Sequence, residues 1–220
     1  MKIFKKLIFL SLFLLQMHNL SAQKKLLFSR DYWHKGSATL KSGQTLAGLI
    51  KYHLDENVIL IQGYDQKITA YSSAQINNFY IWDTLTRVQR NFFTLRTRDA
   101  AQSSYNFYEL LFQGQVSLLS REKTAFTPIK DPTQPKLVNQ NEWSFKEDYF
   151  LLNAQGKIKT YHKLDTLGDV LRVEKKELQE FIQENDLNLE SRKDFVFLID
   201  HYNEVLSLRE SKNREQNQKN

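Results

Sequence analysis

From residue 37 to residue 82, short apolar-rich stretches are separated by turns of three to five residues. Most of these stretches alternate apolar and polar residues, and residues 58–61 form a continuous apolar run, which is typical of a central strand covered on both faces. Side chains of a strand alternate between two faces, so this period of two predicts β-strands. The expected strands are residues 37–41, 45–53, 58–61, 67–71 and 76–82. Gly43 supplies positive φ in the first turn, and Gly48 inside the second strand indicates a bend. The series predicts a small antiparallel barrel or a strongly curled sheet.

The same period continues from residue 88 to residue 162, which predicts a second antiparallel region. The expected strands are residues 88–99, 105–113, 115–121, 145–152 and 157–162. Gly114 and residues 153–156 mark tight turns between two pairs of these strands. Residues 127–143 contain all three prolines of the chain among polar residues, and we expect a long loop that acts as a flap or a binding loop.

After residue 162 the apolar period lengthens to that of an α-helix. Residues 174–185 carry one apolar stripe, and residues 191–208 carry a broader one, formed by Phe195, Leu198, Ile199, Tyr202, Val205 and Leu206. Residues 209–220 contain no apolar side chain and are expected to form a disordered tail. The predicted fold is α+β, with an antiparallel barrel or curled sheet, further antiparallel hairpins, and two C-terminal helices packed on the sheet. Residues 23–208 form one domain, with its helices at about residues 166–208.

Four segments resemble a recurring pattern in uncharacterised exported bacterial proteins. They are ATLKSGQTLAGLIKYH (38–53), KITAYSSAQINNFYI (67–81), FYELLFQGQVSLLSR (107–121) and FLIDHYNEVL (197–206). The shared positions are turn glycines and core residues, so the resemblance implies a β-rich N-terminal region with a small-barrel-like opening and a helical C-terminus. It implies no activity. The first hairpin is also similar to that of Sm-like small barrels, but no basic RNA-contacting loop follows it, which argues against an RNA partner.

The first 22 residues have the three parts of a secretory signal peptide. Residues 1–6 are positively charged, residues 7–15 form an apolar run of nine, and residues 16–22 are polar and end in Leu-Ser-Ala. A bilayer span requires roughly 20 apolar residues, so cleavage after Ala22 is favoured over an uncleaved anchor. The chain contains no cysteine for a disulfide or a lipid anchor. We expect a periplasmic or secreted mature protein without a membrane span.

The charge of the chain does not indicate a nucleic-acid partner. The formal charge is +6, from 31 basic and 25 acidic residues. Three of the lysines belong to the predicted signal peptide, and residues 209–220 carry four basic and two acidic residues. The folded part is therefore almost neutral, and we expect no nucleic acid among its partners. Apolar residues make up 41% of the chain, which excludes a wholly disordered protein.

The residue types of catalytic and metal sites occur in isolation. Four histidines follow the signal peptide, and none lies within five residues of another: His34, His53, His162 and His201. Without cysteine, this spacing predicts no metal site and no cofactor, although a site assembled from distant positions is the alternative. Residues 120–123 match the Ser-x-x-Lys pattern, but that chemistry needs the start of a helix, and a strand is expected here. No catalytic residue is predicted.

Three arginines form the candidate ligand-binding site. Arg90, Arg96 and Arg98 lie on one face of the strand predicted over residues 88–99. Guanidinium groups offer fork-shaped donors to phosphates and carboxylates, so this face could bind an anionic polymer of the cell envelope. The alternative is a solvated strand face whose arginines pair with glutamates on a neighbouring strand.

Aromatic residues are the second candidate for binding. Trp33, Trp82 and Trp143, with ten tyrosines, could stack on sugar rings or on a protein partner, although we expect most of them in the core. The predicted function is a non-catalytic exported protein that binds an envelope component, such as a protein or an anionic polymer, or an extracellular ligand. The alternatives are a hydrolytic enzyme with a site assembled from dispersed residues and a purely structural envelope module. The sequence does not indicate the oligomeric state.

Overall fold

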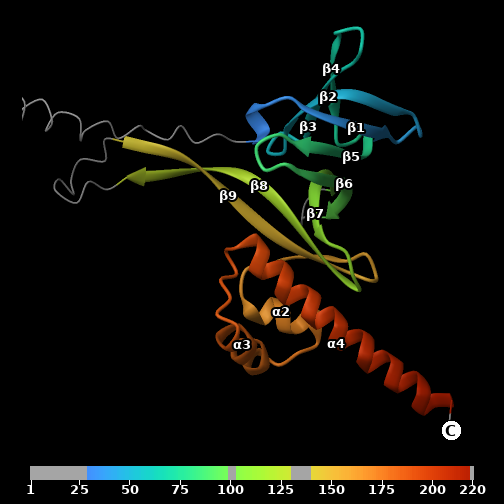
Figure 1. Ribbon diagram of the computed structural model, residues 1–220, viewed down its shortest axis with the longest axis vertical. Helices are drawn as coiled ribbons and strands as arrows, with labels where there is room; N and C mark the ends of the chain where they lie inside the picture. The colour runs from blue at the N-terminus through green and yellow to red at the C-terminus, as the bar shows by residue number, and fades with distance from the viewer. Residues whose placement is uncertain (1–28, 99–102, 130–139, 219–220) are drawn as a thin grey trace, which may run out of the picture.

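The computed structural model describes residues 29–98, 103–129 and 140–218, and it shows an α+β protein with one antiparallel sheet (Figure 1). The sheet has ten strands in the order β10-β9-β8-β7-β6-β5-β1-β2-β3-β4. The strands are β1 (His34–Leu40), β2 (Thr45–His53), β3 (Val58–Gln62), β4 (Ile68–Ser72), β5 (Ile76–Asp83), β6 (Val88–Arg98), β7 (Ser103–Phe112), β8 (Val116–Ile129), β9 (Gln140–Asn153) and β10 (Ile158–Thr160). A 3-10 turn, η2 (Ser29–Asp31), precedes them. The predicted signal peptide lies outside the described residues.

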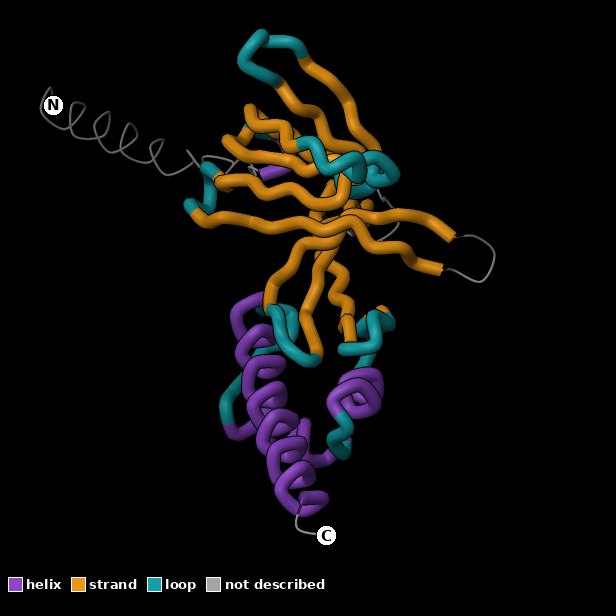
Figure 2. The backbone as a smooth tube through the Cα atoms, turned by 90° about the vertical axis from the view of Figure 1, so that its right-hand side faces the viewer, coloured by secondary structure: helices purple, strands orange, loops and turns teal. Residues whose placement is uncertain are grey.

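Three helices follow the sheet, α2 (Leu164–Leu171), α3 (Lys175–Glu184) and α4 (Arg192–Gln218). They gather at one end of the molecule, and the curled strands lie at the other (Figure 2). The two predicted C-terminal helices are confirmed as α3 and α4. The sequence did not predict α2 as a separate helix, since it has only eight residues with Gly168 inside. It ends at Arg172, whose φ of 54° is left-handed and whose N–H donates to the Gly168 carbonyl.

The strand ladder is curled and does not close. β7 pairs with β8 only through Glu109, Leu110 and Phe112, and no ladder joins the rest of β7 to β8. The turn after β2 bridges this region, because Asn57 Oδ1 accepts a hydrogen bond from the Phe107 N–H, 3.3 Å, and Arg121 donates to the Leu54 carbonyl, 3.0 Å. The curled-sheet alternative is therefore confirmed, and the closed barrel is wrong.

Strands β8 and β9 are longer than the sequence predicted. They form a hairpin that pairs continuously from Val116 with Asn153 to Ile129 with Gln140. The predicted loop at residues 127–143 is therefore shorter at both ends, and its middle lies outside the described residues. Pro128 was one reason to predict a loop here, because proline lacks the N–H that a strand residue donates to its neighbour. Pro128 is nevertheless opposite Asn141 in the ladder, and β7 does not pair with this part of β8, so a missing donor is tolerated there.

Two glycines allow the curl of the first strands. Gly36 of β1 is directly opposite Gly48 of β2. A Cβ atom at Gly36 would lie 2.2 Å from the carbonyl oxygen of Tyr80, and one at Gly48 would lie 2.2 Å from that of Gln62. Both contacts are with the backbone of an adjoining strand, so a side chain at either position would push strands apart.

Replacing Gly48 with alanine is expected to lower the free energy of unfolding by about 1–3 kcal/mol, because the added methyl group forces a backbone shift. Gly63→Ala is the matched control, since a Cβ there would meet only the carboxylate of Asp65, at 3.0 Å, and that side chain can rotate. Urea denaturation measures both costs. Equal costs for the two variants would contradict a close strand approach at Gly48.

The sheet and the helices enclose two apolar cores. One core fills the curl of the sheet and includes Tyr52, Phe79 and Phe92, and the other lies between the β8–β9 hairpin and the three helices. Phe79 stacks on Phe92 with ring centroids 4.5 Å apart. The two cores are separate clusters of buried residues, and charged side chains lie between them.

Helix α4 is fastened to the start of β8 by one buried amide. Asn203 Oδ1 accepts from the Val116 N–H, and Asn203 Nδ2 donates to the Val116 carbonyl, both at 2.9 Å. Gly114 permits the approach, because a Cβ there would lie 2.4 Å from Asn203 Oδ1. The helix also continues to Gln218, through the segment that the sequence assigned to a disordered tail. The described side chains of that segment are exposed, and Glu210 and Arg214 pair across one turn of it, 3.7 Å apart.

Candidate functional site

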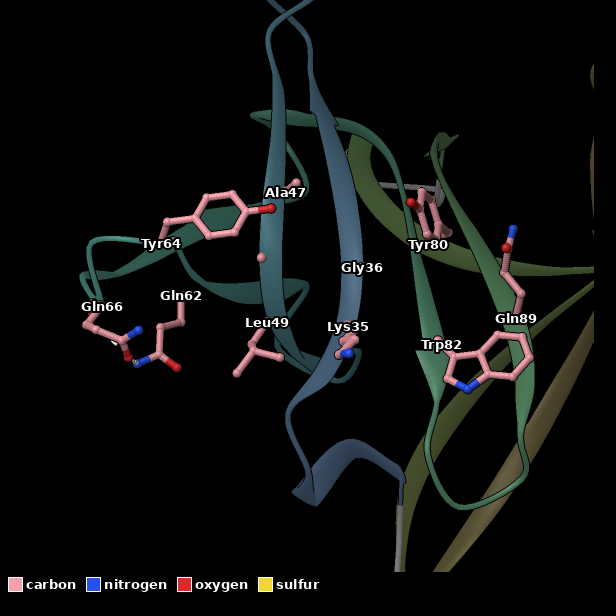
Figure 3. Close-up of a pocket in the computed structure, with 12 residues that line it drawn as sticks. Lys35, Gly36, Ala47, Leu49, Gln62, Tyr64, Gln66, Tyr80, Trp82 and Gln89 are labelled. Carbon is pink, nitrogen blue, oxygen red and sulfur yellow. Dashed lines mark hydrogen bonds between the residues drawn. The ribbon is translucent and has the colours of Figure 1, made fainter.

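A groove of about 660 Å³ crosses the part of the sheet formed by β5, β1, β2 and β3, and we call it the aromatic groove (Figure 3). Its walls carry aromatic side chains, with Tyr64 on one side of β1 and β2, and Tyr80 and Trp82 on the other. The lining residues are Lys35, Gly36, Ala47, Gly48, Leu49, Gln62, Gly63, Tyr64, Gln66, Tyr80, Trp82 and Gln89.

The alternation of β5 places Tyr80 and Trp82 in the groove. Phe79 and Ile81 point into the core and are buried, so the residues between and after them face outward. Tyr80 is 42% exposed and Trp82 is 49% exposed. The sequence left these two residues open between a core role and a stacking role, because aromatic residues usually fill cores. The sequence feature that identifies them is the alternation along β5, in which Tyr80 and Trp82 occupy the face opposite to that of Phe79 and Ile81.

The floor of the aromatic groove is formed by β1 and β2, whose outward-facing side chains there are Lys35, Ala47 and Leu49. Gly36 and Gly48 contribute backbone to the groove, and a side chain at either would point to the opposite, buried face of the sheet. Glutamines supply donors and acceptors at the edges, and Gln62 Nε2 donates to Gln66 Oε1, 3.0 Å. Within the described structure, Lys35 is the one charged residue that lines the groove. The site therefore combines aromatic faces with amide hydrogen bonding and little charge.

Arg90 lies inside the protein, at the centre of a group of buried charges. Its guanidinium binds Glu109 through Nε at 2.9 Å and through NH2 at 2.6 Å, and NH2 also contacts Glu122 at 2.5 Å. NH1 donates to the Tyr52 hydroxyl at 2.7 Å and lies 3.5 Å from Asp83. Burial alone lowers the pKa of Arg90, but the hydrogen bonds and charges of Glu109 outweigh it and raise the pKa, so the side chain stays charged.

The charges extend from Arg90 to the first residue of α4. Glu109 Oε1 also accepts from Arg192 NH1, 2.9 Å, and Arg192 NH2 donates to Glu147 at 2.5 Å. The Tyr149 hydroxyl donates to the same Glu147 carboxylate, 3.0 Å. We call Asp83, Arg90, Glu109, Glu122, Glu147 and Arg192 the ion-pair network. It connects the curled sheet, the long hairpin and the helices in one chain of contacts.

The structure does not place the three predicted arginines in one common environment. Arg90 is 5% exposed, so the expectation that it shares a solvated face is wrong, because its donors bind the glutamates of β7 and β8. Pairing with glutamates on neighbouring strands, the alternative to ligand binding, describes Arg90, although that pairing is buried. Arg96 is exposed and lines a second pocket. The side chain of Arg98 lies outside the described residues, and binding by Arg96 and Arg98 stays a prediction.

A serine, a histidine and an aspartate meet near the start of β1, in a geometry that does not suit nucleophilic catalysis. The Ser29 hydroxyl donates to Asp83, and no bond joins that hydroxyl to His34. His34 is fully buried, its Nε2 donates to the Ser29 carbonyl at 2.6 Å, and its Nδ1 accepts from the Thr84 N–H at 3.2 Å. Both ring nitrogens serve the backbone, so the imidazole has no nitrogen left to take a proton from a hydroxyl.

Hydrogen bonds determine the ionisation of Asp83. Burial alone raises the pKa of its carboxyl group, but the Ser29 hydroxyl and the N–H groups of Leu85 and Thr86 bind the charged form. Together with the positive charge of Arg90, they hold the pKa of Asp83 below its usual value. Asp83 therefore stays ionised at neutral pH and anchors the residues before β1 to the ion-pair network.

The described residues contain no group of three or more histidine, aspartate or glutamate side chains placed to hold a metal ion. None of the helices in the described ranges is long and apolar enough to cross a bilayer. The Ser-x-x-Lys match lies on β8, where the Lys123 ammonium pairs with Asp148 at 2.6 Å. No protein-family model, curated protein or solved structure matches the chain.

Proposed function

We propose that this protein is a non-catalytic exported protein that binds a glycan of the cell envelope in the aromatic groove. The observation that supports the proposal most is the pair Tyr80 and Trp82, two large aromatic side chains left half exposed beside the groove floor that β1 and β2 form. Large contiguous apolar patches on the surface of a folded protein often mark binding surfaces. The first 22 residues, with their signal-peptide pattern, support export.

A sugar ring fits the chemistry of the groove better than a protein partner does. Pyranose rings present flat C–H faces, which stack on aromatic rings, and hydroxyl groups, which pair with amides such as those of Gln62, Gln66 and Gln89. Protein interfaces favour arginine and methionine with their aromatic anchors, and neither lines this groove in the described structure. The lining also contains no carboxylate or histidine, so it favours binding over hydrolysis at this place.

Trp82→Ala is expected to weaken oligosaccharide binding about tenfold or more, because the loss of an aromatic platform typically costs more than about 1.4 kcal/mol. A panel of neutral oligosaccharides, including N-acetylglucosamine oligomers and peptidoglycan fragments, is titrated while tryptophan fluorescence and heat are recorded. Since Trp82 is 49% exposed, the melting temperature should change little.

Tyr80→Ala and Tyr105→Ala form the matched pair for this experiment. Both tyrosines are 42% exposed, but only Tyr80 lines the aromatic groove. Tyr80→Ala should weaken binding and Tyr105→Ala should leave it unchanged. The proposal is wrong if none of the oligosaccharides binds, or if the Trp82 variant binds them as the parent does.

A further inference from the structure

A second cavity, of about 490 Å³, lies where the ends of β6 and β7 approach β9 and β10, and we call it the cationic pocket. Three positively charged side chains from three parts of the chain line it, namely Arg96 of β6, Arg121 of β8 and Lys157 just before β10. Among the described residues, no aspartate or glutamate lines it. The pocket therefore has a positive charge that its own lining does not neutralise.

Arg121 is positioned by groups that leave its charge unbalanced. NH2 donates to the Leu54 carbonyl at 3.0 Å and to Asn57 Oδ1 at 3.2 Å, and the guanidinium lies over the ring of Tyr108. Its Nε is buried and has no hydrogen-bond partner in the described part of the chain. Asp148 is its cross-strand neighbour, but that carboxylate is bound by Lys123 at 2.6 Å. The described residues give Arg121 no carboxylate partner, and an arginine held in this way is suited to bind an anion.

Hydroxyl groups add neutral donors to the same cavity. Asn106 Nδ2 donates to Thr97 Oγ1 at 2.6 Å and to Ser104 Oγ at 3.0 Å. Each hydroxyl oxygen thus accepts a hydrogen bond, and its own hydrogen remains to be donated. Asn106 is held in turn by Asn57, whose Nδ2 donates to Asn106 Oδ1 at 2.9 Å. Both hydroxyls belong to the lining of the pocket.

We propose that the cationic pocket binds a phosphate group. A phosphate has three or four oxygens that accept from guanidinium, ammonium and hydroxyl donors together, which matches a site with three cations and several hydroxyls. The group can come from free phosphate or from a phosphate-containing polymer, and both present the same oxygens. The proposal is independent of glycan binding, since the cationic pocket and the aromatic groove share no residue.

Calorimetric titration of the full mature chain at pH 7 and low salt tests this inference, with inorganic phosphate and short-chain polyphosphate as separate probes and acetate as the comparison anion. We expect phosphate or polyphosphate to bind more tightly than acetate, and added salt to weaken the binding. Binding of both probes would indicate a site for free phosphate, whereas binding of polyphosphate alone would indicate a polymer site. The inference is wrong if neither probe binds better than acetate.

Lys157→Gln is the decisive variant, and Lys159→Gln is its matched control. Both remove one positive charge from the same hairpin, but Lys159 does not line the pocket and pairs with Asp169 at 3.6 Å. Lys157→Gln should weaken phosphate binding about tenfold or more, the usual effect of losing a charge-assisted hydrogen bond, and Lys159→Gln should change it little. Equal losses in both variants would show attraction to overall charge and would overturn the site.

Arg121→Gln and Arg121→Lys add a second test with melting temperature as the folding check. Arg121→Gln should abolish binding, and Arg121→Lys should restore part of it, because lysine returns the charge without the forked donors. If Arg121→Gln fails to fold, the Lys157 and Lys159 pair alone decides the question. Arg96→Gln extends the same titration to the arginine that the sequence already singled out.

Discussion

Arg90→Leu is expected to lower the free energy of unfolding at pH 7 by about 3–5 kcal/mol, a large part of the stability of a domain of this size. Arg90 is 5% exposed and lies within 3.5 Å of the carboxylates of Asp83, Glu109 and Glu122. Removing the guanidinium leaves those negative charges together in a buried place, where they repel one another and are poorly solvated. Breaking a buried pair by removing one partner is costly for that reason.

The pH dependence of this variant should have the opposite sign to that of the parent. In the parent the pKa of Asp83 is held low, so its contribution to stability is present above the ordinary pKa and is lost as the pH falls through the lowered value. Without Arg90, the pKa of Asp83 loses one of the interactions that hold it low and rises, and protonation of a carboxylate then relieves the repulsion. The stability deficit of Arg90→Leu should therefore shrink as the pH falls from about 7 to about 5.

Arg209→Leu is the control for Arg90→Leu, with the same substitution at an exposed ion pair. The side chain of Arg209 is 48% exposed, and its contact with Glu177 is 3.8 Å long, so its loss should cost less than about 1 kcal/mol. Urea denaturation of both variants at several pH values measures the costs. Similar costs for the two variants, or a deficit that grows on acidification, would contradict the central role of Arg90.

The local pattern of the sequence was sufficient to predict most elements of the fold. Alternation identified most of the strands, and a continuous apolar run identified β3. In β3 and β5 buried residues alternate with more exposed ones, whereas β4 and β10 contain no fully buried residue. Gly43 has a φ of 91° and Gly156 a φ of 74°, both in predicted turns. The helix stripes predicted α3 and α4, whose buried residues include Leu178 and Leu198. These features depend on residues close together in the chain.

Contacts between distant residues were the part that the sequence did not predict. Arg90 is 19 residues from Glu109, which is 83 residues from Arg192, so no spacing rule relates the three. Arg90 and Arg96 lie on the same face of β6 by alternation, yet Arg90 is buried and Arg96 is exposed. This difference follows from the curl of the sheet, which the local sequence pattern does not show. Both pockets likewise collect residues from strands that are distant in the chain.

The C-terminal helix α4 is expected to be part of the core rather than a free interaction helix. Leu198 is fully buried in the cluster formed by the helices and the β8–β9 hairpin, next to Phe195, Ile199 and Tyr202. The same helix is fixed to the main chain of Val116 by Asn203. Burial of a leucine contributes about 1.5–3 kcal/mol, so several such residues together are comparable to the stability of the whole domain.

Leu198→Ala is therefore expected to cost about 2–5 kcal/mol, and Leu198→Asp to prevent the helices from packing on the sheet, because it places an unpaired carboxylate in an apolar core. Leu208→Asp is the control, since it makes the same change on the same helix at a side chain that is 62% exposed. Thermal melts followed by near-UV and far-UV circular dichroism compare the three. Leu208→Asp should melt like the parent, whereas Leu198→Asp should lose its near-UV signal at room temperature. A Leu198→Asp variant that melts like Leu208→Asp would mean that α4 is not docked in solution, and that its apolar stripe is a surface for a partner.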